Sequence, residues 1–136
     1  MRYLGIDYGT RKCGLALSDE GGSMGFPYKI IPNDTGLYDK LVLIIKSENV
    51  GAVVMGESKD LAGNDNAIAN AARLLGTFIM NEAKVPVYYE PEMFTSAEAR
   101  RARDESVTGR SPKSTDAVDA SAAALILTSY LSKKHD

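Results

Sequence analysis

The sequence predicts an α/β fold, a mixed five-stranded sheet with helices on both faces, in the order β-β-β-α-β-α-β-α-α. The chain opens with short apolar segments joined by glycine-containing turns, which is typical of an antiparallel meander. Apolar residues at helical spacing then alternate with further strand-like runs, which is typical of helices packed on a sheet. No internal repeat or polar linker divides the chain, so we expect a single domain over residues 1–136.

Residues 3–7 form the first strand of the meander, a short apolar run that ends in an acid. A turn with a glycine follows, and residues 13–19 alternate well enough for a second strand. Residues 24–31 make a third strand, which Pro32 ends. Because the connections are short, we expect antiparallel pairing.

The rest of the chain predicts helices alternating with strands. Residues 37–45 and 68–83 place apolar side chains at helical spacing. Residues 51–56 are continuously apolar, which is typical of a central strand buried on both faces, and residues 85–90 form one more strand. The fifth strand is therefore expected to run parallel to the first.

Two helices are expected to close the chain. Thr95 and Glu98 form a capping box, so one helix is expected to begin at Thr95. The last helix is expected over residues 115–133 and is rich in alanine, which indicates close packing on a neighbouring surface.

Composition predicts a soluble cytoplasmic protein. The chain is 44% hydrophobic and 25% charged, as ordinary globular proteins are. No apolar stretch reaches the roughly 20 residues of a membrane helix, and the first residues do not resemble a signal peptide. The single cysteine, Cys13, fits a reducing compartment, and with the single histidine, His135, in the C-terminal tail it excludes a His/Cys zinc site within the chain.

Acids at the ends of predicted strands are the first candidates for chemistry. Asp7 ends the first strand, and Glu90 and Glu92 lie at the end of the fifth. The carboxyl ends of parallel strands gather ligands, so these acids could approach one another. The alternatives are that Asp7 caps the turn by binding the amides of Gly9 or Thr10, and that the glutamates are solvated loop acids.

Asp119 is a further candidate, because small residues surround it in the last helix. Asp116 lies three residues earlier and is more typical of a first-turn acid favoured by the helix dipole. If several carboxylates converge, protons or a hard divalent cation must relieve their repulsion. Mg²⁺ prefers such oxygen ligands, and paired ions can clamp the reacting oxygens of a phosphodiester.

The net charge of −2 gives no overall positive field, so any phosphate binding must depend on local cations. Arg11 and Lys12 lie in the turn after Asp7, where they could meet a nucleic-acid backbone. A second basic segment could be either a nucleic-acid contact or a solvated helix face; it contains Arg100, Arg101, Arg103, Arg110 and Lys113.

Three other residues are more typical of structural roles. Cys13 is interpreted as a small strand residue, because no histidine accompanies it. Tyr88 and Tyr89 are more typical of sheet residues than of base-stacking platforms.

Several segments together resemble the YqgF family, whose members are also called RuvX. Residues 5–19, GIDYGTRKCGLALSD, resemble the family's opening strands and turn. The other matching segments, in the family's order, are 53–56 (VVMG), Gly63, 92–100 (EMFTSAEAR) and 119–127 (DASAAALIL).

This resemblance implies a ribonuclease H-like fold and a metal-dependent acid triad. Matched motif by motif, the triad falls on Asp7, Glu92 and Asp119, with Glu90 as the alternative middle acid. Mg²⁺ or Mn²⁺ is the implied cofactor. The implied substrates are structured RNA, as in processing of the pre-16S ribosomal RNA, or branched DNA, as in resolution of Holliday junctions. A homodimer would suit a junction substrate, and no membrane partner is expected.

Departures from the family pattern leave other functions open. The chain has Pro91-Glu92-Met93 where the family usually has Asp-Glu-Arg, so an arginine is missing beside the middle acid. A non-catalytic nucleic-acid-binding or ribosome-assembly factor that retains the fold is therefore the main alternative. Actin-like ATPases and sugar kinases have an Asp-x-Gly-Thr turn that Asp7-Tyr8-Gly9-Thr10 matches, but they need a second domain to enclose ATP.

Overall fold

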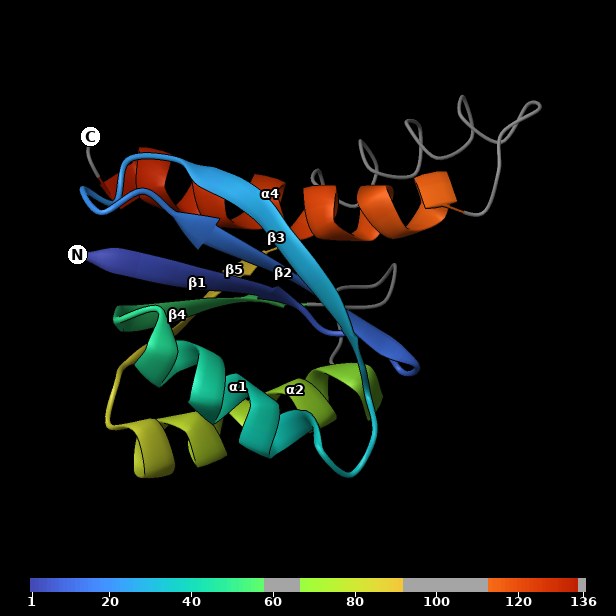
Figure 1. Cartoon of the computed structure of the whole chain (residues 1–136). Helices are drawn as coiled ribbons and strands as arrows, with labels where there is room; N and C mark the ends of the chain where they lie inside the picture. The colour runs from blue at the N-terminus through green and yellow to red at the C-terminus, as the bar shows by residue number, and fades with distance from the viewer. Residues whose placement is uncertain (58–66, 92–112, 135–136) are drawn as a thin grey trace.

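A five-stranded mixed sheet forms the centre of the computed structural model, which describes residues 1–57, 67–91 and 113–134, without the side chains of 113–119. The strand order is β3-β2-β1-β4-β5, so β3 and β5 are the two edges. Helices α1 and α2 lie on one face and α4 lies on the other (Figure 1). The predicted order of elements is confirmed in the described residues, and the helix expected from Thr95 lies outside them.

The meander has the expected antiparallel pairing. Strand β1 pairs with β2, placing Leu4 opposite Leu17, and β2 pairs with β3. Strand β4 lies parallel to β1, and β5 lies parallel to β4, so the carboxyl ends of these three strands share one edge of the sheet. The elements are β1 (Arg2–Asp7), β2 (Lys12–Ser18), β3 (Gly25–Pro32), α1 (Leu37–Ser47), β4 (Val50–Glu57), α2 (Ala67–Ala83), β5 (Val87–Pro91) and α4 (Lys113–Lys134).

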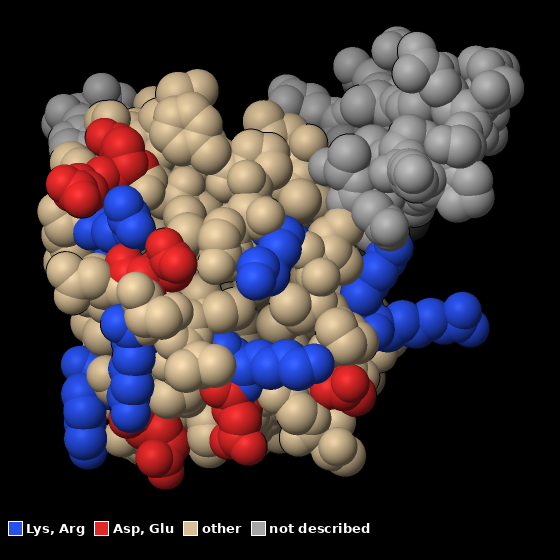
Figure 2. Space-filling view, viewed as in Figure 1, with Lys and Arg blue, Asp and Glu red and all other residues tan. Residues whose placement is uncertain are grey.

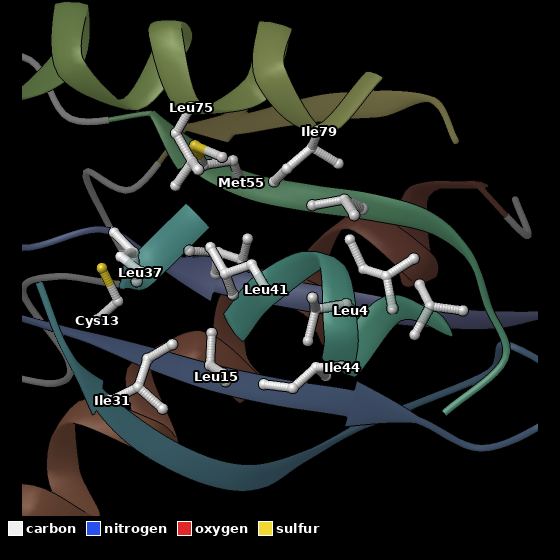
Figure 3. Close-up of a cluster of buried hydrophobic side chains, with 14 of the residues drawn as sticks. Leu4, Cys13, Leu15, Ile31, Leu37, Leu41, Ile44, Met55, Leu75 and Ile79 are labelled. Atoms are coloured by element: carbon white, nitrogen blue, oxygen red, sulfur yellow. The ribbon is translucent and has the colours of Figure 1, made fainter. Parts of the chain in front are cut away.

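The larger apolar core lies between the sheet and helices α1 and α2. Figure 3 shows side chains from β1, β2 and β4 meeting those of the two helices, including Leu4, Leu15, Leu41, Met55 and Ile79. All of these are fully buried. Because successive strand residues point to opposite faces, this packing turns the odd-numbered residues of β1 toward α4.

Helix α4 packs very closely on the other face of the sheet. A methyl group added at Gly5 would come within 2.9 Å of Leu127 Cβ and 3.1 Å of the Ala123 carbonyl oxygen. Gly25 also faces Leu127, and its N–H donates to Thr128 Oγ1 at 3.0 Å. The absence of side chains at these glycines therefore lets α4 approach the sheet backbone. No helix in the described ranges is long and apolar enough to cross a membrane.

The turn between β2 and β3 is organised by one carboxylate. Asp19 Oδ1 accepts from the N–H groups of Ser23 and Met24 at 2.9 and 3.0 Å, and Oδ2 accepts from Ser23 Oγ at 2.8 Å. These bonds, led by the one from Met24, lower the pKa of Asp19 to about 2. Gly22 adopts a φ of 68° in this turn, a conformation that glycine tolerates.

We predict that Gly5→Ala destabilises the fold by about 1–3 kcal/mol, because the added methyl group meets a backbone carbonyl that cannot easily move. The measurement is the free energy of unfolding in urea. Gly36→Ala is the matched control, since its added methyl group would be 3.4 Å from Asp34 Oδ1, an ordinary contact. The control should remain within about 1 kcal/mol of the wild type. Equal stabilities for both variants would contradict the close packing of α4.

The Asp19 turn predicts a defined pH dependence. A carboxyl group whose pKa is lowered in the folded state stabilises the fold above its unfolded pKa, here near 3.8, and loses that effect as pH falls toward about 2. The difference in urea midpoint between the wild type and Asp19→Asn should therefore shrink over this range. A difference that is constant from pH 5 to pH 2 would contradict this role.

Candidate metal and nucleic-acid site

Asp7 ends β1 at the sheet edge where the parallel strands also end. It lies opposite Gly14 of β2, and its side chain is half-buried. A pocket of about 240 Å³ is lined by Asp7 together with residues of the β1–β2 turn, namely Gly9, Thr10, Arg11, Lys12 and Gly14. The structure therefore brings Asp7, Arg11 and Lys12 together around one hollow.

Asn33 holds the turn that forms this pocket. Its side-chain amide donates to the Gly9 carbonyl at 2.7 Å, and its backbone N–H donates to the Arg11 carbonyl at 2.8 Å. A side chain at Gly9 would collide with the Lys12 carbonyl oxygen, so the turn needs glycine there. Sequence reasoning missed Asn33; the available signal was an asparagine directly after the proline that ends β3.

The pocket combines a carboxylate with two cations. Arg11 is exposed and Lys12 is half-buried. On the face shown in Figure 2, basic and acidic side chains are interspersed, and basic ones project at the right-hand side, where the β1–β2 turn lies in Figure 1. The positive charge of Arg11 and Lys12 is therefore confined to this turn, in keeping with a chain whose net charge is slightly negative.

Cys13, next to this turn, has no exposed surface. Burial raises the pKa of its thiol to about 11, the bond with the Gly9 backbone opposes that shift, and the charge of Asp7 adds to it. The thiol is protonated at neutral pH, so Cys13 is a packing residue, as expected, rather than a nucleophile.

Helix α4 brings position 119 toward the Asp7 end of the sheet. Ala123 and Leu127 lie against Gly5, and Tyr130 lies beside Tyr3. The helix therefore runs opposite to β1, and position 119, one turn before Ala123, lies further toward the end of β1 that carries Asp7. The side chain of Asp119 is outside the described part of the structure.

Glu90, the alternative middle acid, binds the other half of α4. Its side chain is 5% exposed, and its Oε2 accepts from Lys133 Nζ at 2.6 Å and from Ser129 Oγ at 2.9 Å. Ser129 is ten residues beyond Asp119, which corresponds to about 15 Å of helix. Glu90 therefore ties β5 to the C-terminal half of α4, a contact that sequence reasoning did not identify.

The other predicted site residues lie outside the part of the chain that the structure describes. Glu92, Arg100, Arg101, Arg103 and Arg110 lie outside the described residues, and Lys113 begins α4 with its side chain outside them. Among the side chains that are described, no three acids, histidines or cysteines form a cluster able to hold a metal. The convergence of Asp7, Glu92 and Asp119 thus stays a prediction.

Comparison with known proteins identifies the family. A family model described as RuvX, Holliday junction resolvase, matches residues 1–133. This chain belongs to the RuvX family.

Two relatives of this chain carry the same name. A "Putative pre-16S rRNA nuclease" of Nitratidesulfovibrio vulgaris (strain DSM 19637 / Miyazaki F) is 36% identical over 134 residues, covering 96% of this chain and 93% of the relative. A protein of the same name from Lactococcus lactis subsp. cremoris (strain SK11) is 33% identical over 134 residues, with the same coverage.

Solved structures show the fold. RuvC of Thermus thermophilus, in complex with a Holliday junction substrate, matches with a TM-score of 0.62 at 18% identity, covering 99% of this chain and 96% of that chain. The Fowlpox virus resolvase in complex with Holliday junction DNA matches with a TM-score of 0.62 at 11% identity over the full length of both chains. The expected ribonuclease H-like fold is therefore confirmed.

The contact between Glu90 and Lys133 makes a prediction about stability. Lys133→Met keeps the aliphatic stem but leaves a buried carboxylate with Ser129 as its remaining bonded partner. We expect a loss of about 1–2 kcal/mol in urea unfolding, toward the lower end for a bond to a charged group because Lys133 is largely exposed. Lys133→Arg should retain most of the stability. A Lys133→Met loss below about 0.5 kcal/mol would place this pair among ordinary surface ion pairs.

Proposed function

We propose that this RuvX-family chain is a single-domain, divalent-metal-dependent nuclease that hydrolyses phosphodiesters in structured nucleic acid. The observation that carries the proposal is the placement of Asp7, at the end of a central strand in a pocket that also contains Arg11 and Lys12. The proposed ligands of Mg²⁺ or Mn²⁺ are Asp7, Glu92 and Asp119.

The described part of the site fits a hard cation. Asp7 offers carboxylate oxygens, and the pocket lining contains backbone and side-chain oxygen but no histidine or cysteine. Mg²⁺ and Mn²⁺ prefer oxygen ligands of this kind. When bound, such an ion would stabilise the negative charge that develops on the phosphoryl oxygens during hydrolysis.

Glu92 is the better candidate for the middle acid. Glu90 already has a lysine and a serine on its carboxylate, and these partners belong to the far half of α4. Removing Glu90 from that contact would leave Lys133 without its acid and would uncouple β5 from the helix. Glu92 follows β5 directly and carries the match to the family motif.

The chain's cations would position the substrate. Arg11 and Lys12 lie beside Asp7 and can offset the charge of the phosphodiester as it approaches the acids. Hydrolysis then adds one water across the scissile bond. Its oxygen forms a new bond to phosphorus, the bond from phosphorus to the leaving sugar oxygen breaks, and that oxygen takes a proton.

The names of the relatives support a substrate class for the proposed nuclease. The two relatives described above are named "Putative pre-16S rRNA nuclease", and the structurally similar RuvC and Fowlpox virus resolvases were solved in complex with Holliday junctions. We infer structured RNA or branched DNA as the substrate. A cleavage assay that compares a pre-16S RNA fragment with a four-way DNA junction, each with and without Mn²⁺, separates the two.

We predict that Asp7→Asn abolishes metal-dependent cleavage and leaves the fold intact, because the amide keeps the shape but loses the charge that binds the cation. Mn²⁺ should raise the melting temperature of the wild type and much less that of Asp7→Asn. Asp39→Asn, at an exposed site in the first turn of α1, is the matched control and should cleave as the wild type does. Wild-type cleavage by Asp7→Asn would exclude Asp7 from the site.

A second candidate function is a nucleic-acid-binding or ribosome-assembly factor without catalysis. Met93 favours it, because the family's arginine at this position would provide a bidentate contact to phosphate, and methionine offers no donor. Tight binding of the RNA and a metal-dependent rise in melting temperature, without cleavage of either substrate, would support this second candidate.

A further inference from the structure

A row of tyrosines crosses the α4 face of the sheet, beyond the residues of the proposed catalytic site. Tyr3 of β1, Tyr130 of α4 and Tyr88 of β5 follow one another, with ring centroids 6.2 Å apart in the first pair and 5.4 Å in the second. Tyr3 is 3% exposed and Tyr88 is 38% exposed. The row therefore runs from the apolar core to the molecular surface.

Tyr88 ends this row with an aromatic surface open to solvent. Its ring stacks on that of Tyr130, with an angle of 18° between the planes. Tyr130 therefore lies against one face of the ring, and the 38% of Tyr88 that is exposed forms the outer end of the row. Tyr89 points to the opposite side, where it packs against the core below α2. The sequence favours a structural role in the sheet for both tyrosines. In the structure they lie on opposite faces of the sheet, and Tyr88 is the one at the surface.

Positive charge borders the exposed ring. On β5 and residues 120–134 of α4, the charged residues are Glu90, Lys133 and Lys134. Lys133 is paired with the buried Glu90 carboxylate, so Lys134 is the cation of these segments whose charge no acid on them offsets. Lys134 Nζ lies 5.4 Å from the centroid of the Tyr3 ring, beside the same row.

We propose that Tyr88, backed by Tyr130, is a stacking platform for an unpaired base of single-stranded nucleic acid whose phosphates pass over Lys134 at the C-terminal end of α4. Every base has a π face, so an aromatic ring flanked by cations binds single strands with little sequence preference. Because Tyr130 holds the ring of Tyr88 from behind, little side-chain freedom is lost on binding.

This inference rests on the proposed function, because it takes nucleic acid to be the ligand. It adds the path that a single nucleic-acid strand would take over the protein surface. Tyr88 is three residues before Pro91, where β5 ends, which corresponds to about 10 Å of strand. The platform would therefore hold an unpaired nucleotide near the β5 end of the site, and the substrate would need a single-stranded segment beside the cleaved bond.

The chain contains no tryptophan, so one introduced tryptophan reports on its own position. Tyr88→Trp places the reporter on the platform, and Phe26→Trp places a control at a 50% exposed site on β3, the opposite edge of the sheet. Each variant is titrated with single-stranded RNA and DNA oligonucleotides without divalent metal, and binding is followed separately by anisotropy of the labelled oligonucleotide.

We expect the oligonucleotide to quench the fluorescence of Tyr88→Trp and to leave that of Phe26→Trp unchanged. Quenching by RNA, DNA or both supports the proposal and identifies the preferred strand. Binding without quenching at position 88, equal quenching in both variants, or quenching by fully paired duplex alone would overturn it. No oligonucleotide binding at all would also overturn it and leave the tyrosine row as internal packing.

Affinity provides a second readout. Tyr88→Leu removes the ring and should weaken oligonucleotide binding by roughly five- to a hundredfold, whereas Tyr88→Phe should remain within about twofold of the wild type. Phe26→Leu is the matched control and should not change the affinity. Equal affinities for Tyr88→Leu and Tyr88→Phe would overturn the proposal, with melting temperatures showing that both variants are folded.

These outcomes can be told apart from those for the proposed nuclease. Cleavage that depends on Asp7, together with unquenched Tyr88→Trp, would overturn the platform and leave the nuclease standing. Quenching of Tyr88→Trp without any metal-dependent cleavage would support the platform and overturn the nuclease.

Discussion

The seating of α4 on glycines of the sheet is the contact on which the rest of the structure depends. Gly5 and Gly25 have no side chains to hold the helix away, so Leu127 fills the space above them and Thr128 bonds to the backbone of β3. The helix carries Asp119 and the sheet carries Asp7. Their relative placement is thus set by apolar contact and steric fit, before any metal or substrate contributes.

The acid with a structural role and the acid of the candidate site have different surroundings. Glu90 is buried and tied to Lys133 and Ser129, whereas Asp7 lines a pocket with Arg11 and Lys12. Asn33 supports that pocket through backbone carbonyls, with no charge of its own. The contact with Lys133 lets Glu90 stabilise the folded chain, whereas Asp7 borders a pocket of about 240 Å³.

The order of helices and strands could be predicted because the spacing of apolar residues indicates which face of each helix or strand is buried. The continuous apolar run at 51–56 became β4, an interior strand of the sheet, and the short apolar run at 3–7 became β1. The start of β5 was predicted two residues early, at Val85. Pro86 has no N–H to give to a strand ladder, although its carbonyl accepts from Val53 at 2.9 Å, and the regular strand begins at Val87.

The candidate site could be predicted only in part. Asp7, Arg11 and Lys12 are close in sequence, so one turn brings them together. The contacts of Glu90 with Lys133 and of Asn33 with Gly9 join residues 43 and 24 positions apart, and no local pattern encodes such distances. Tyr88 and Tyr89 show the same limit of sequence-based prediction. They are neighbours on one strand and point to opposite faces of the sheet, so their exposure depends on which helices cover each face.

The composition of the two edge strands has a consequence for self-association. An unprotected edge offers a row of backbone donors and acceptors to another chain. Strand β3 contains Pro27 and ends at Pro32, and its register with β2 shifts between Leu15 and Ala16. Strand β5 is five residues long and ends at Pro91. Prolines, a bulge and a short edge all discourage continuation of the sheet into a second molecule, which protects against edge-to-edge aggregation. Pairing of β3 or β5 with an edge strand of a second copy is therefore disfavoured.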